Sequence, residues 1–247
     1  LQVTGARVYM LRLIDGNNYL RRTLDSDLTG LVPRNIFSNA KATDLWVWDA
    51  PDGNARRRKI YPEYKMGRPK TPDDIRATVQ FVKDLLVHTS AMQITMPGYE
   101  ADDVIATFAK SMKDVHIVSN DSDYLALGVP CDAKPIPYVS SNYIRLYKAT
   151  VGDTADNIPG IKGFGAKKFQ DCSMYLWDDY FRGMIPWVAT GEFCRADQMI
   201  EENIETVRTF YQIVGFFDVP LDLIQQHLSV GVPSFEKGDA MLKEYLN

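Results

Sequence analysis

Residues 7–18 read RVYMLRLIDGNN, a β-rich apolar run that passes directly into Asp15-Gly16-Asn17-Asn18. Aliphatic and aromatic residues favour strands, and a cluster of Asp, Gly and Asn is typical of a turn. This stretch predicts a strand over 7–14 that ends at a carboxylate. In open parallel sheets, sites form just outside the carboxyl ends of the strands, so Asp15 is a candidate site residue.

Two further short apolar runs end in the same way. Residues 45–48 (LWVW) run into Asp49, and residues 115–118 (VHIV) run into the sequence SNDSD, which begins at Ser119 and contains Asp121. Apolar strands that alternate with helices predict an α/β fold with a mostly parallel central sheet flanked by helices. The helices expected between the strands cover 74–87 and 100–112.

The pattern changes after about residue 150, beyond which no clear strands are predicted. Residues 131–140, with Pro135 and Pro137, indicate a loop. We therefore expect an α/β core over 1–150 and a helical C-terminal region over 151–247. The candidate helices of this second region cover 166–182, 196–214 and 220–228.

Composition limits the class of protein. The chain has 247 residues, 45% of them hydrophobic and 24% charged, which is ordinary for a globular domain and argues against disorder. No apolar run approaches the roughly 18 residues of a membrane span. The histidines are isolated, which argues against a zinc site or a Ser-His-Asp triad. Three cysteines without a CxxC pair are interpreted as free thiols: Cys131, Cys172 and Cys194.

Nine carboxylates form the strongest signal in the sequence. Each taken singly is equally well explained as a helix cap. Gathered in one cleft, they would repel each other unless cations neutralised them, and oxygen-only clusters suit Mg²⁺ or Mn²⁺. Two such ions can clamp the attacking and leaving oxygens of a phosphoryl displacement, so the pattern predicts a two-metal phosphodiesterase. The nine are Asp15, Asp49, Glu100, Asp102, Asp103, Asp121, Asp123, Asp153 and Asp156.

Basic residues lie close to these carboxylates in two places. Seven Lys or Arg fall within residues 56–70, interleaved with two tyrosines, and residues 157–168 form a glycine-rich loop that opens a helix. Basic groups bind phosphate, aromatic rings stack on unpaired bases, and glycines let backbone amides approach a ligand. A solvated basic loop is the alternative for the first segment. The candidate DNA-binding residues are Tyr64, Arg56, Arg57, Arg58, Lys70, Lys162, Gly163, Gly165, Lys167 and Lys168.

Taken together, these motifs resemble the flap endonuclease / 5′-3′ exonuclease family. The likeness is greatest to stand-alone bacteriophage 5′ nucleases and to the 5′-nuclease domain of bacterial DNA polymerase I. It covers residues 8 to about 170 in the family's order, although the stretch between Asp123 and Gly152 looks shorter than in many relatives. The matching motifs are LIDGNN (13–18), WD (48–49), YKMGR (64–68), EADD (100–103), SNDSD (119–123) and GDTADNIPG (152–160).

The resemblance implies a PIN-like 5′-nuclease fold with a helical arch at about 58–90 and a helix–three-turn–helix element at about 150–182. It implies hydrolysis of DNA near 5′ ends, flaps, nicks or gaps, leaving 5′-phosphate and 3′-hydroxyl products, in replication or repair. Lys65 and Arg68 would stabilise charge on the scissile phosphate, and Tyr64 would stack on a base. Two clusters would hold two or more Mg²⁺ or Mn²⁺ ions: Asp15, Asp49, Glu100, Asp102 and Asp103, then Asp121, Asp123, Asp153 and Asp156.

The same resemblance implies the setting in which the protein acts. K⁺ could sit at the helix–three-turn–helix loop, residues 158–168, which would grip duplex DNA. We expect a stand-alone monomer in the cytoplasm of a bacterial or phage-infected cell, with branched or 5′-ended duplex DNA as its partner. No membrane partner is expected, and replication proteins are possible partners. Without the nine site carboxylates, the formal charge of −4 becomes about +5, which is compatible with a basic DNA-binding face.

Two alternatives remain open from the sequence. A ribonuclease H-like enzyme could use the same site on RNA primers or RNA–DNA hybrids, because both substrates present the same backbone and differ in the 2′-hydroxyl. A non-catalytic module that binds DNA junctions could keep the fold. The full set of carboxylates argues against this second alternative, because unused repelling charges are costly.

Overall fold

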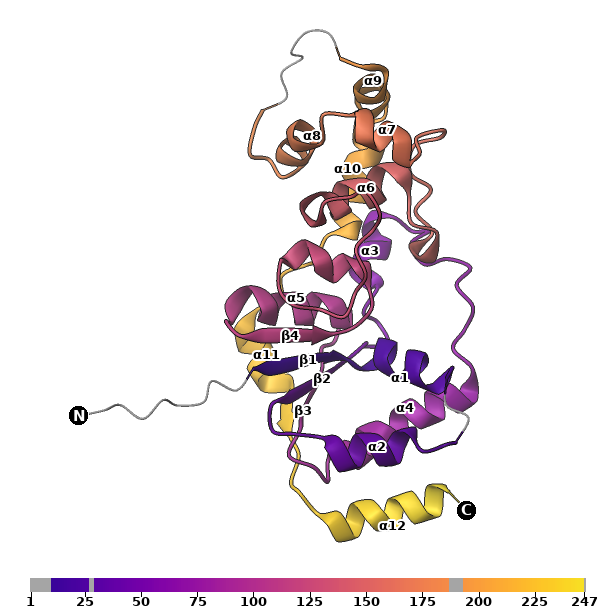
Figure 1. The fold of residues 1–247 in the computed structure, drawn as a ribbon, viewed down its shortest axis with the longest axis vertical. Helices are drawn as coiled ribbons and strands as arrows, with labels where there is room; N and C mark the ends of the chain where they lie inside the picture. Colours follow the sequence, from indigo (N-terminus) through magenta and orange to yellow (C-terminus); the bar gives the residue numbers. More distant parts are fainter. Residues whose placement is uncertain (1–9, 27–28, 187–192, 247) are drawn as a thin grey trace, which may run out of the picture.

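A five-stranded sheet lies at the centre of the molecule, in the order β4-β1-β2-β3-β5 (Figure 1). The computed structural model describes residues 10–26, 29–186 and 193–246. Strands β1 to β4 run parallel to their neighbours, and β5 pairs antiparallel with β3. The predicted, mostly parallel α/β sheet is therefore confirmed. The strands are β1 (Leu11–Asp15), β2 (Asp44–Trp48), β3 (Met92–Thr95), β4 (Val115–Val118) and β5 (Leu228–Val230).

Helices cover both faces of this sheet, and successive residues of β1 show why. Side chains alternate between the two faces of a strand. Leu13 belongs to a buried cluster with Val104 and Tyr124, whereas Ile14 belongs to a second cluster with Val82. Both faces are thus apolar and need a helical layer. The helices of the two layers are α1 (Gly16–Leu24), α2 (Val32–Asn39), α4 (Asp73–Leu86), α5 (Ala101–Ser111), the 3₁₀ helix η1 (Ser122–Leu127) and α11 (Leu221–His227).

The last part of the chain returns to the sheet. The prediction that no strand follows residue 150 is wrong, because β5 pairs with β3 at the sheet edge, with Leu228 opposite Ile94. A strand of three residues is too short to show alternation in the sequence. Helix α12 (Phe235–Tyr245) then packs outside α2 and α4, where the rings of Tyr245 and Phe81 stack with centroids 4.1 Å apart (Figure 1).

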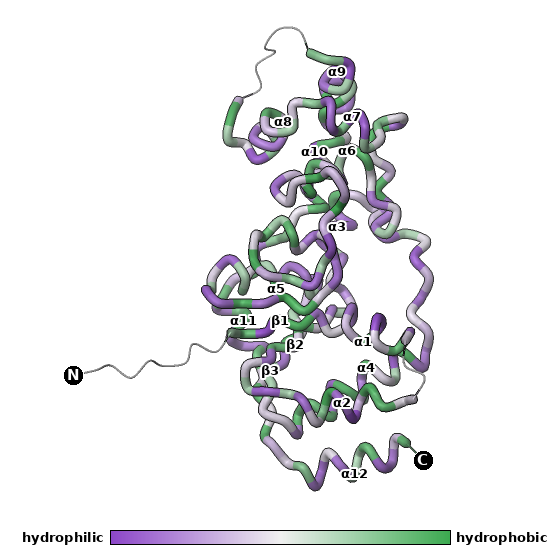
Figure 2. Tube along the Cα trace, viewed as in Figure 1, coloured by the Kyte–Doolittle hydropathy of each residue, from purple (hydrophilic) through white to green (hydrophobic). Residues whose placement is uncertain are grey.

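A second packed region, at the top of Figure 1, has its own core around Leu146, Phe169 and Trp177. The colours of Figure 2 show hydrophobic segments of α6 and α10 side by side there. The predicted helix over 166–182 is two helices, because Asp197 accepts hydrogen bonds from the backbone and hydroxyl of Ser173 between them. The predicted helix over 196–214 also divides, at residue 203. This region contains η2 (Ser141–Tyr143), α6 (Ile144–Val151), η3 (Thr154–Asp156), α7 (Ala166–Asp171), α8 (Met174–Phe181), α9 (Arg195–Glu202) and α10 (Ile204–Val214).

The span predicted to form the arch, 58–90, begins in α3 (Ala55–Ile60) and runs through α4 to the turn that follows it. Its middle, residues 61–72, is not helical and links the upper region to the lower one on the right of Figure 1. The helical remainder, α4, packs on the sheet through Val82 and Leu86. Helix α4 has 14 residues, and none of the helices in the described ranges is long and apolar enough to cross a bilayer.

Candidate active site

The carboxyl ends of β1, β2 and β4 bring three aspartates to one edge of the sheet. Asp15 and Asp121 cap the helices that follow them, each accepting a backbone N–H at 3.1 and 3.0 Å respectively. Asp49 Oδ1 accepts the N–H of Ala101 at 2.9 Å and so holds the start of α5. Capping uses one oxygen of each side chain. The two explanations considered for these aspartates, helix caps and site residues, are therefore compatible.

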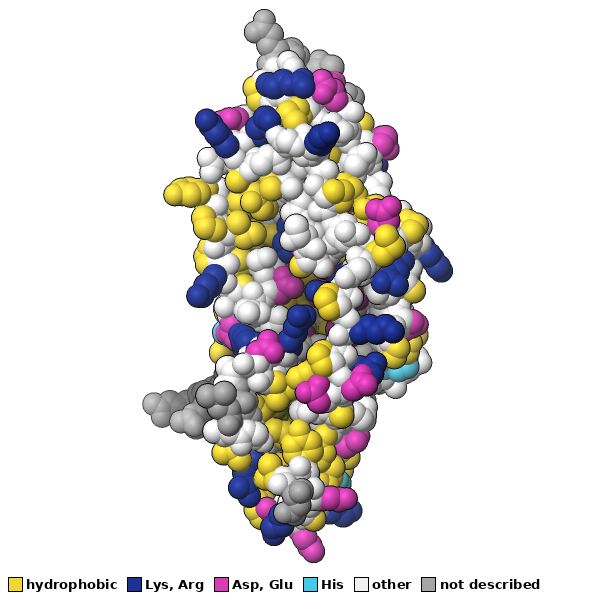
Figure 3. Space-filling model, turned by 90° about the vertical axis from the view of Figure 1, so that its right-hand side faces the viewer, with side chains coloured by type: hydrophobic (Ala, Val, Ile, Leu, Met, Phe, Trp, Pro, Cys, Tyr) yellow, Lys and Arg dark blue, Asp and Glu magenta, His cyan; other side chains and the backbone are white. Residues whose placement is uncertain are grey.

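Two adjoining cavities collect most of the predicted carboxylates. The first, of about 190 Å³, lies between the sheet edge, α5 and residues 65–71, and the second, of about 620 Å³, extends toward η3. Acidic and basic side chains lie next to each other at mid-height of the face shown in Figure 3. Eight of the nine predicted carboxylates line the two cavities: Asp15, Asp49, Glu100, Asp102, Asp121, Asp123 and Asp156 in the first, and Asp153 in the second.

The ninth carboxylate, Asp103, is fully buried and belongs to an ion pair. Its two oxygens accept hydrogen bonds from the Arg57 guanidinium at 2.7 and 2.8 Å. Arg57 is itself only 1% exposed and also contacts Glu100 Oε2 at 2.8 Å and the carbonyls of Ile213 and Gly215 at 2.9 and 3.1 Å. The predictions that Asp103 binds metal and that Arg57 contacts DNA are wrong, because each satisfies the other inside the protein.

Tyr64 and Lys65 approach the carboxylates from residues 61–72. The Tyr64 side chain is buried, and its hydroxyl lies 3.0 Å from Glu100 Oε2 and 3.1 Å from Asp156 Oδ2. The prediction that Tyr64 stacks on a base is therefore wrong, since its ring is not accessible. Lys65 Nζ lies 2.6 Å from Glu100 Oε1, and Arg68 Nη2 lies 3.9 Å from Asp156 Oδ1. Both cations line the first cavity.

Lys148 contacts a second group of carboxylates, which includes Asp123 and Asp153. No sequence motif had indicated this lysine as a site residue. It lies on α6 and is buried, with its Nζ 2.5 Å from Asp123 Oδ1 and 2.9 Å from Asp153 Oδ2. The signal that could have found it is a single lysine in a short apolar helix, five positions before Asp153. A buried lysine needs a partner, and here the partners are the site carboxylates.

Burial shifts the pKa values of these carboxylates. The pKa of Asp15 is raised to about 7, chiefly by burial and then by the nearby charges of Asp49 and Asp121. The pKa of Asp123 is also raised to about 7 by burial, against the opposing effect of Lys148. Burial would raise the pKa of Glu100 too, but its cationic neighbours Lys65 and Arg57 hold it below the ordinary value. Groups with raised values are protonated more readily in the folded than in the unfolded state.

Metal-free protein is therefore expected to lose stability as the pH rises from 5 to 8. Asp15 and Asp123 have folded pKa values of about 7, above the ordinary 3.8, so their contribution is greatest at low pH and disappears as the pH passes through 7. Melting temperatures in EDTA, measured across this range, should fall with pH, and Asp15→Asn should flatten the slope. A melting temperature that rises across the window would contradict this reading of the site.

The donor chemistry fits a hard divalent cation. The candidate ligands are all carboxylate oxygens, which Mg²⁺ and Mn²⁺ prefer. Asp102 Oδ1 is buried, makes no hydrogen bond among the described residues, and lies 3.7 Å from Arg57 Nη2. In the side-chain positions shown, no three Asp, Glu, His or Cys of the described ranges converge on one ion. Lys65 and Lys148 instead lie against the carboxylates.

The remaining predicted DNA contacts lie at the surface. A cavity of about 500 Å³ beside Asp49 and Glu100 is lined by four basic residues: Arg58, Lys65, Arg68 and Lys70. In the loop at 158–168, a positive φ of 73° at Gly163 suits glycine, whose carbonyl accepts a hydrogen bond from the half-buried Lys168 at 2.5 Å. The exposed candidates are Arg56, Arg58, Lys70, Lys162, Gly163, Gly165 and Lys167.

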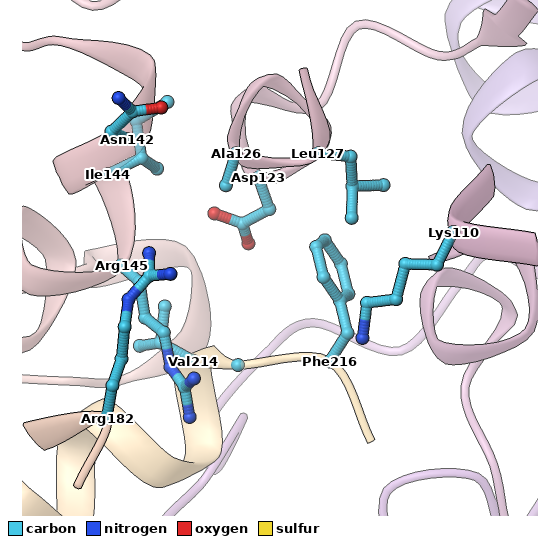
Figure 4. A pocket seen from close by; sticks show the side chains of 11 residues that line it. Lys110, Asp123, Ala126, Leu127, Asn142, Ile144, Arg145, Arg182, Val214 and Phe216 are labelled. Atoms are coloured by element: carbon cyan, nitrogen blue, oxygen red, sulfur yellow. The ribbon is translucent and has the colours of Figure 1, made fainter. Parts of the chain in front are cut away.

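One more cavity, of about 210 Å³, shares Asp123 with the carboxylate site. Figure 4 shows Asp123 pointing from η1 into this space, with Arg182 and Phe216 among the side chains around it. Two of its three cations pair with carboxylates: Lys110 with Asp218, and Arg182 with Asp178, whose oxygen lies 2.6 Å from the guanidinium. The third, Arg145, donates to the Tyr211 carbonyl at 2.6 Å.

A parallel sheet with carboxylates gathered at its carboxyl edge beside Lys and Arg defines an α/β phosphodiesterase-type site. Comparison with known proteins identifies the family to which the chain belongs. Residues 28–134 match the family model for the 5′-3′ exonuclease N-terminal resolvase-like domain. A 5′-3′ exonuclease of Aquifex aeolicus (strain VF5) is 31% identical over 227 residues, which cover 80% of this chain and 73% of that protein. The chain belongs to the 5′-3′ exonuclease family and is a nuclease.

Two further relatives place the likeness in context. DNA polymerase I of Caldicellulosiruptor bescii is 32% identical over 143 residues, 48% of this chain but only 17% of the polymerase. A bacteriophage T5 flap endonuclease, crystallised as a pseudo-enzyme–product complex with DNA and metal ions, has a TM-score of 0.59 at 19% identity, covering 96% of this chain and 97% of that one. The second likeness extends the shared fold to nearly the whole chain.

Proposed function

We propose that the protein is a structure-selective 5′ nuclease that hydrolyses DNA phosphodiesters near 5′ ends, flaps, nicks or gaps. The main support for this proposal is the set of eight carboxylates that line two adjoining cavities, with Lys65 and Arg68 at their edge. Such a surface repels a phosphate backbone unless cations are bound. The T5 relative, which contains both metal ions and DNA, supports the same use of the fold.

The carboxylates would hold two Mg²⁺ or Mn²⁺ ions in two groups. When bound, the ions would neutralise the carboxylates and polarise the scissile phosphate, in the manner of two-metal phosphoryl transfer. In-line attack by water would leave a 5′-phosphate and a 3′-hydroxyl. The first group comprises Asp15, Asp49, Glu100 and Asp102, and the second comprises Asp121, Asp123, Asp153 and Asp156.

The chain's own cations and hydroxyls position this arrangement. Lys65 and Arg68 face the cavity and would bind the non-bridging oxygens of the scissile phosphate, stabilising the charge that develops there. The buried Tyr64 hydroxyl, between Glu100 and Asp156, fixes one carboxylate of each group. Lys65 has a positive φ of 54°, held by its N–H, which donates to the Asp156 carbonyl at 3.0 Å. This contact ties its backbone to the second group.

Surface residues on both sides of the cavities would hold the DNA. The loop over 158–168 would contact the duplex backbone and could bind K⁺ through its carbonyls, and the exposed cations of residues 56–70 would contact the 5′ strand. In this proposal residues 1–150 form the nuclease core and 151–247 the helical DNA-binding region. The protein would act as a cytoplasmic monomer in replication or repair.

The test is cleavage of a labelled 5′-flap duplex with Mg²⁺, with Mn²⁺ or with EDTA. We expect cuts near the junction that require the metal and leave 5′-phosphate and 3′-hydroxyl ends. A covalently closed circular duplex without a 5′ end is the matched control and should stay intact. Equal cutting of the circle, or tight flap binding without cleavage in either metal, would refute the proposal. A parallel substrate with RNA in the 5′ strand ranks DNA against RNA–DNA hybrid.

A further inference from the structure

The Lys148 ammonium group lies among three carboxylates of the second group. Its Nζ is 2.5 Å from Asp123 Oδ1, 2.9 Å from Asp153 Oδ2 and 3.9 Å from Asp121 Oδ1. The lysine side chain is only 11% exposed, and its stem leaves α6 in the middle of the helix. Asp121 and Asp123 lie at the N-terminal end of η1 and Asp153 directly precedes η3, so the ammonium links two segments that are about thirty residues apart in sequence.

The charges around Lys148 do not balance, unlike those of an ordinary buried salt bridge. One ammonium faces three carboxylates, so the group keeps a formal surplus of two negative charges. At Asp153, helix capping and the contact with Lys148 use different oxygens. Oδ1 accepts the Ala155 N–H, whereas Oδ2 faces the lysine. The ammonium therefore occupies oxygens that a divalent ion would need at about 2.0–2.1 Å for Mg²⁺.

The carboxylates of the first group differ from those of the second in their contacts with cations, and this difference affects which group binds metal first. Lys65 Nζ contacts Glu100 Oε1 at 2.6 Å, but Asp102 Oδ1 lies 3.7 Å from Arg57 Nη2, whereas Asp123 Oδ1 lies 2.5 Å from Lys148 Nζ. An ion could therefore reach Asp102 in the first group without breaking a close contact to a cation. In the second group, the contacts of Asp123 and Asp153 with Lys148 must be broken first.

We propose that Lys148 is an internal cation that holds the second carboxylate group together without metal, and that it competes with the divalent ion for Asp123 and Asp153. This inference rests on the proposed function, because it concerns the second of the two metal positions. Lys148 keeps the affinity of this position low, so the first group fills at lower metal concentration. When an ion binds, the ammonium moves into the open cavity of about 620 Å³ that it already lines.

The test is Mn²⁺ titration of the whole chain by calorimetry, comparing wild type with Lys148→Met. Methionine keeps an unbranched stem of similar length and removes the charge. The second group should bind Mn²⁺ at least tenfold more tightly in Lys148→Met, whereas Lys148→Arg, which keeps the charge, should stay weak. An Asp102→Asn background weakens the first group so that the second is observed by itself. Lys237→Met, an exposed position on α12, controls for charge removal elsewhere.

Stability gives an independent readout. In EDTA, Lys148→Met should melt at a lower temperature than wild type, because the three carboxylates then repel each other unrelieved. Saturating Mn²⁺ should raise its melting temperature more than that of wild type, because ligand stabilisation grows with affinity. Equal or weaker Mn²⁺ binding in the folded variant would overturn the inference. No binding of divalent metal to the wild-type protein would instead overturn the proposed function.

A second measurement uses the wild-type chain and does not depend on the variant's folding. Lysine acetylation by a small amine-reactive reagent, read by mass spectrometry, reports the accessibility of Lys148. Its reactivity should rise severalfold when Mn²⁺ is added, while that of Lys237 should not change. Unchanged or lower reactivity at saturating metal would show that the ammonium stays in place, and the inference would fall.

Discussion

Replacing Arg57 by methionine is expected to lower the free energy of unfolding by about 3–5 kcal/mol. The substitution removes the only guanidinium that contacts Asp103 and Glu100 in the described residues, and it leaves Asp103, which is 0% exposed, without its cationic partner. It also leaves the carbonyls of Ile213 and Gly215 without this donor. Burial would lower the pKa of Arg57, yet Asp102 and Asp103 hold it well above its ordinary range, so the charge is always present.

Urea denaturation of wild type, Arg57→Met and Arg56→Met measures this effect. Arg56 is the matched control, because it is the preceding residue but is exposed, with its Nε bonded to the Gly98 carbonyl at 3.1 Å. Arg56→Met should change the free energy of unfolding by no more than about 0.5 kcal/mol, as expected for a surface substitution. If the two variants unfolded at the same urea concentration, the buried network would not carry the stability assigned to it.

Replacing Asp102 by asparagine is expected to reduce the cleavage rate by roughly 10³-fold or more. Metal-ion catalysis supplies several kcal/mol of charge stabilisation, and each 1.36 kcal/mol corresponds to a tenfold change in rate. Asp102 lines the first cavity with an oxygen that has no hydrogen bond within the described ranges. Burial raises its pKa well above the ordinary value, and the neighbouring Asp103 and Glu100 add to this. A neutral amide should therefore fold well but bind metal poorly.

Single-turnover cleavage of the flap substrate, at saturating Mg²⁺, measures the loss. The melting temperature of Asp102→Asn in EDTA should equal or exceed that of wild type, since a repelling charge is removed. Asp222→Asn, an exposed position on α11, is the charge-matched control and should cut at the wild-type rate. An Asp102→Asn enzyme that keeps full Mg²⁺-dependent activity would remove Asp102 from the metal site.

The sequence predicted the scaffold because its signals were local. The runs at 45–48 and 115–118 are strands, and the aspartates that follow them gather at one edge. Strand β3 was missed because Gln93 interrupts its apolar pattern. That side chain is buried through bonds to Trp48 Nε1 at 3.1 Å and the Lys83 carbonyl at 3.0 Å, and these partners lie 45 and 10 positions away in the sequence.

The errors in the site have a common physical origin. Arg56, Arg57 and Arg58 are the same residue type in succession, yet helix α3 turns about 100° per residue and buries only the middle one. Asp102 and Asp103 differ in the same way on α5. Which of two neighbours faces inward depends on the helix phase and on partners as distant as residues 213–215, neither of which a local motif contains.

The contacts between Arg57 and the carbonyls at 213 and 215 also bear on biosynthesis. A growing chain emerges from the ribosome N-terminal end first, and its early segments begin to fold before the later ones exist. All eight cavity-lining carboxylates are translated by residue 156, but the guanidinium that aligns Glu100 lacks two of its acceptors until residue 215 appears. The hydrogen-bond network around Glu100 therefore stays incomplete in the nascent chain until residue 215 has been made.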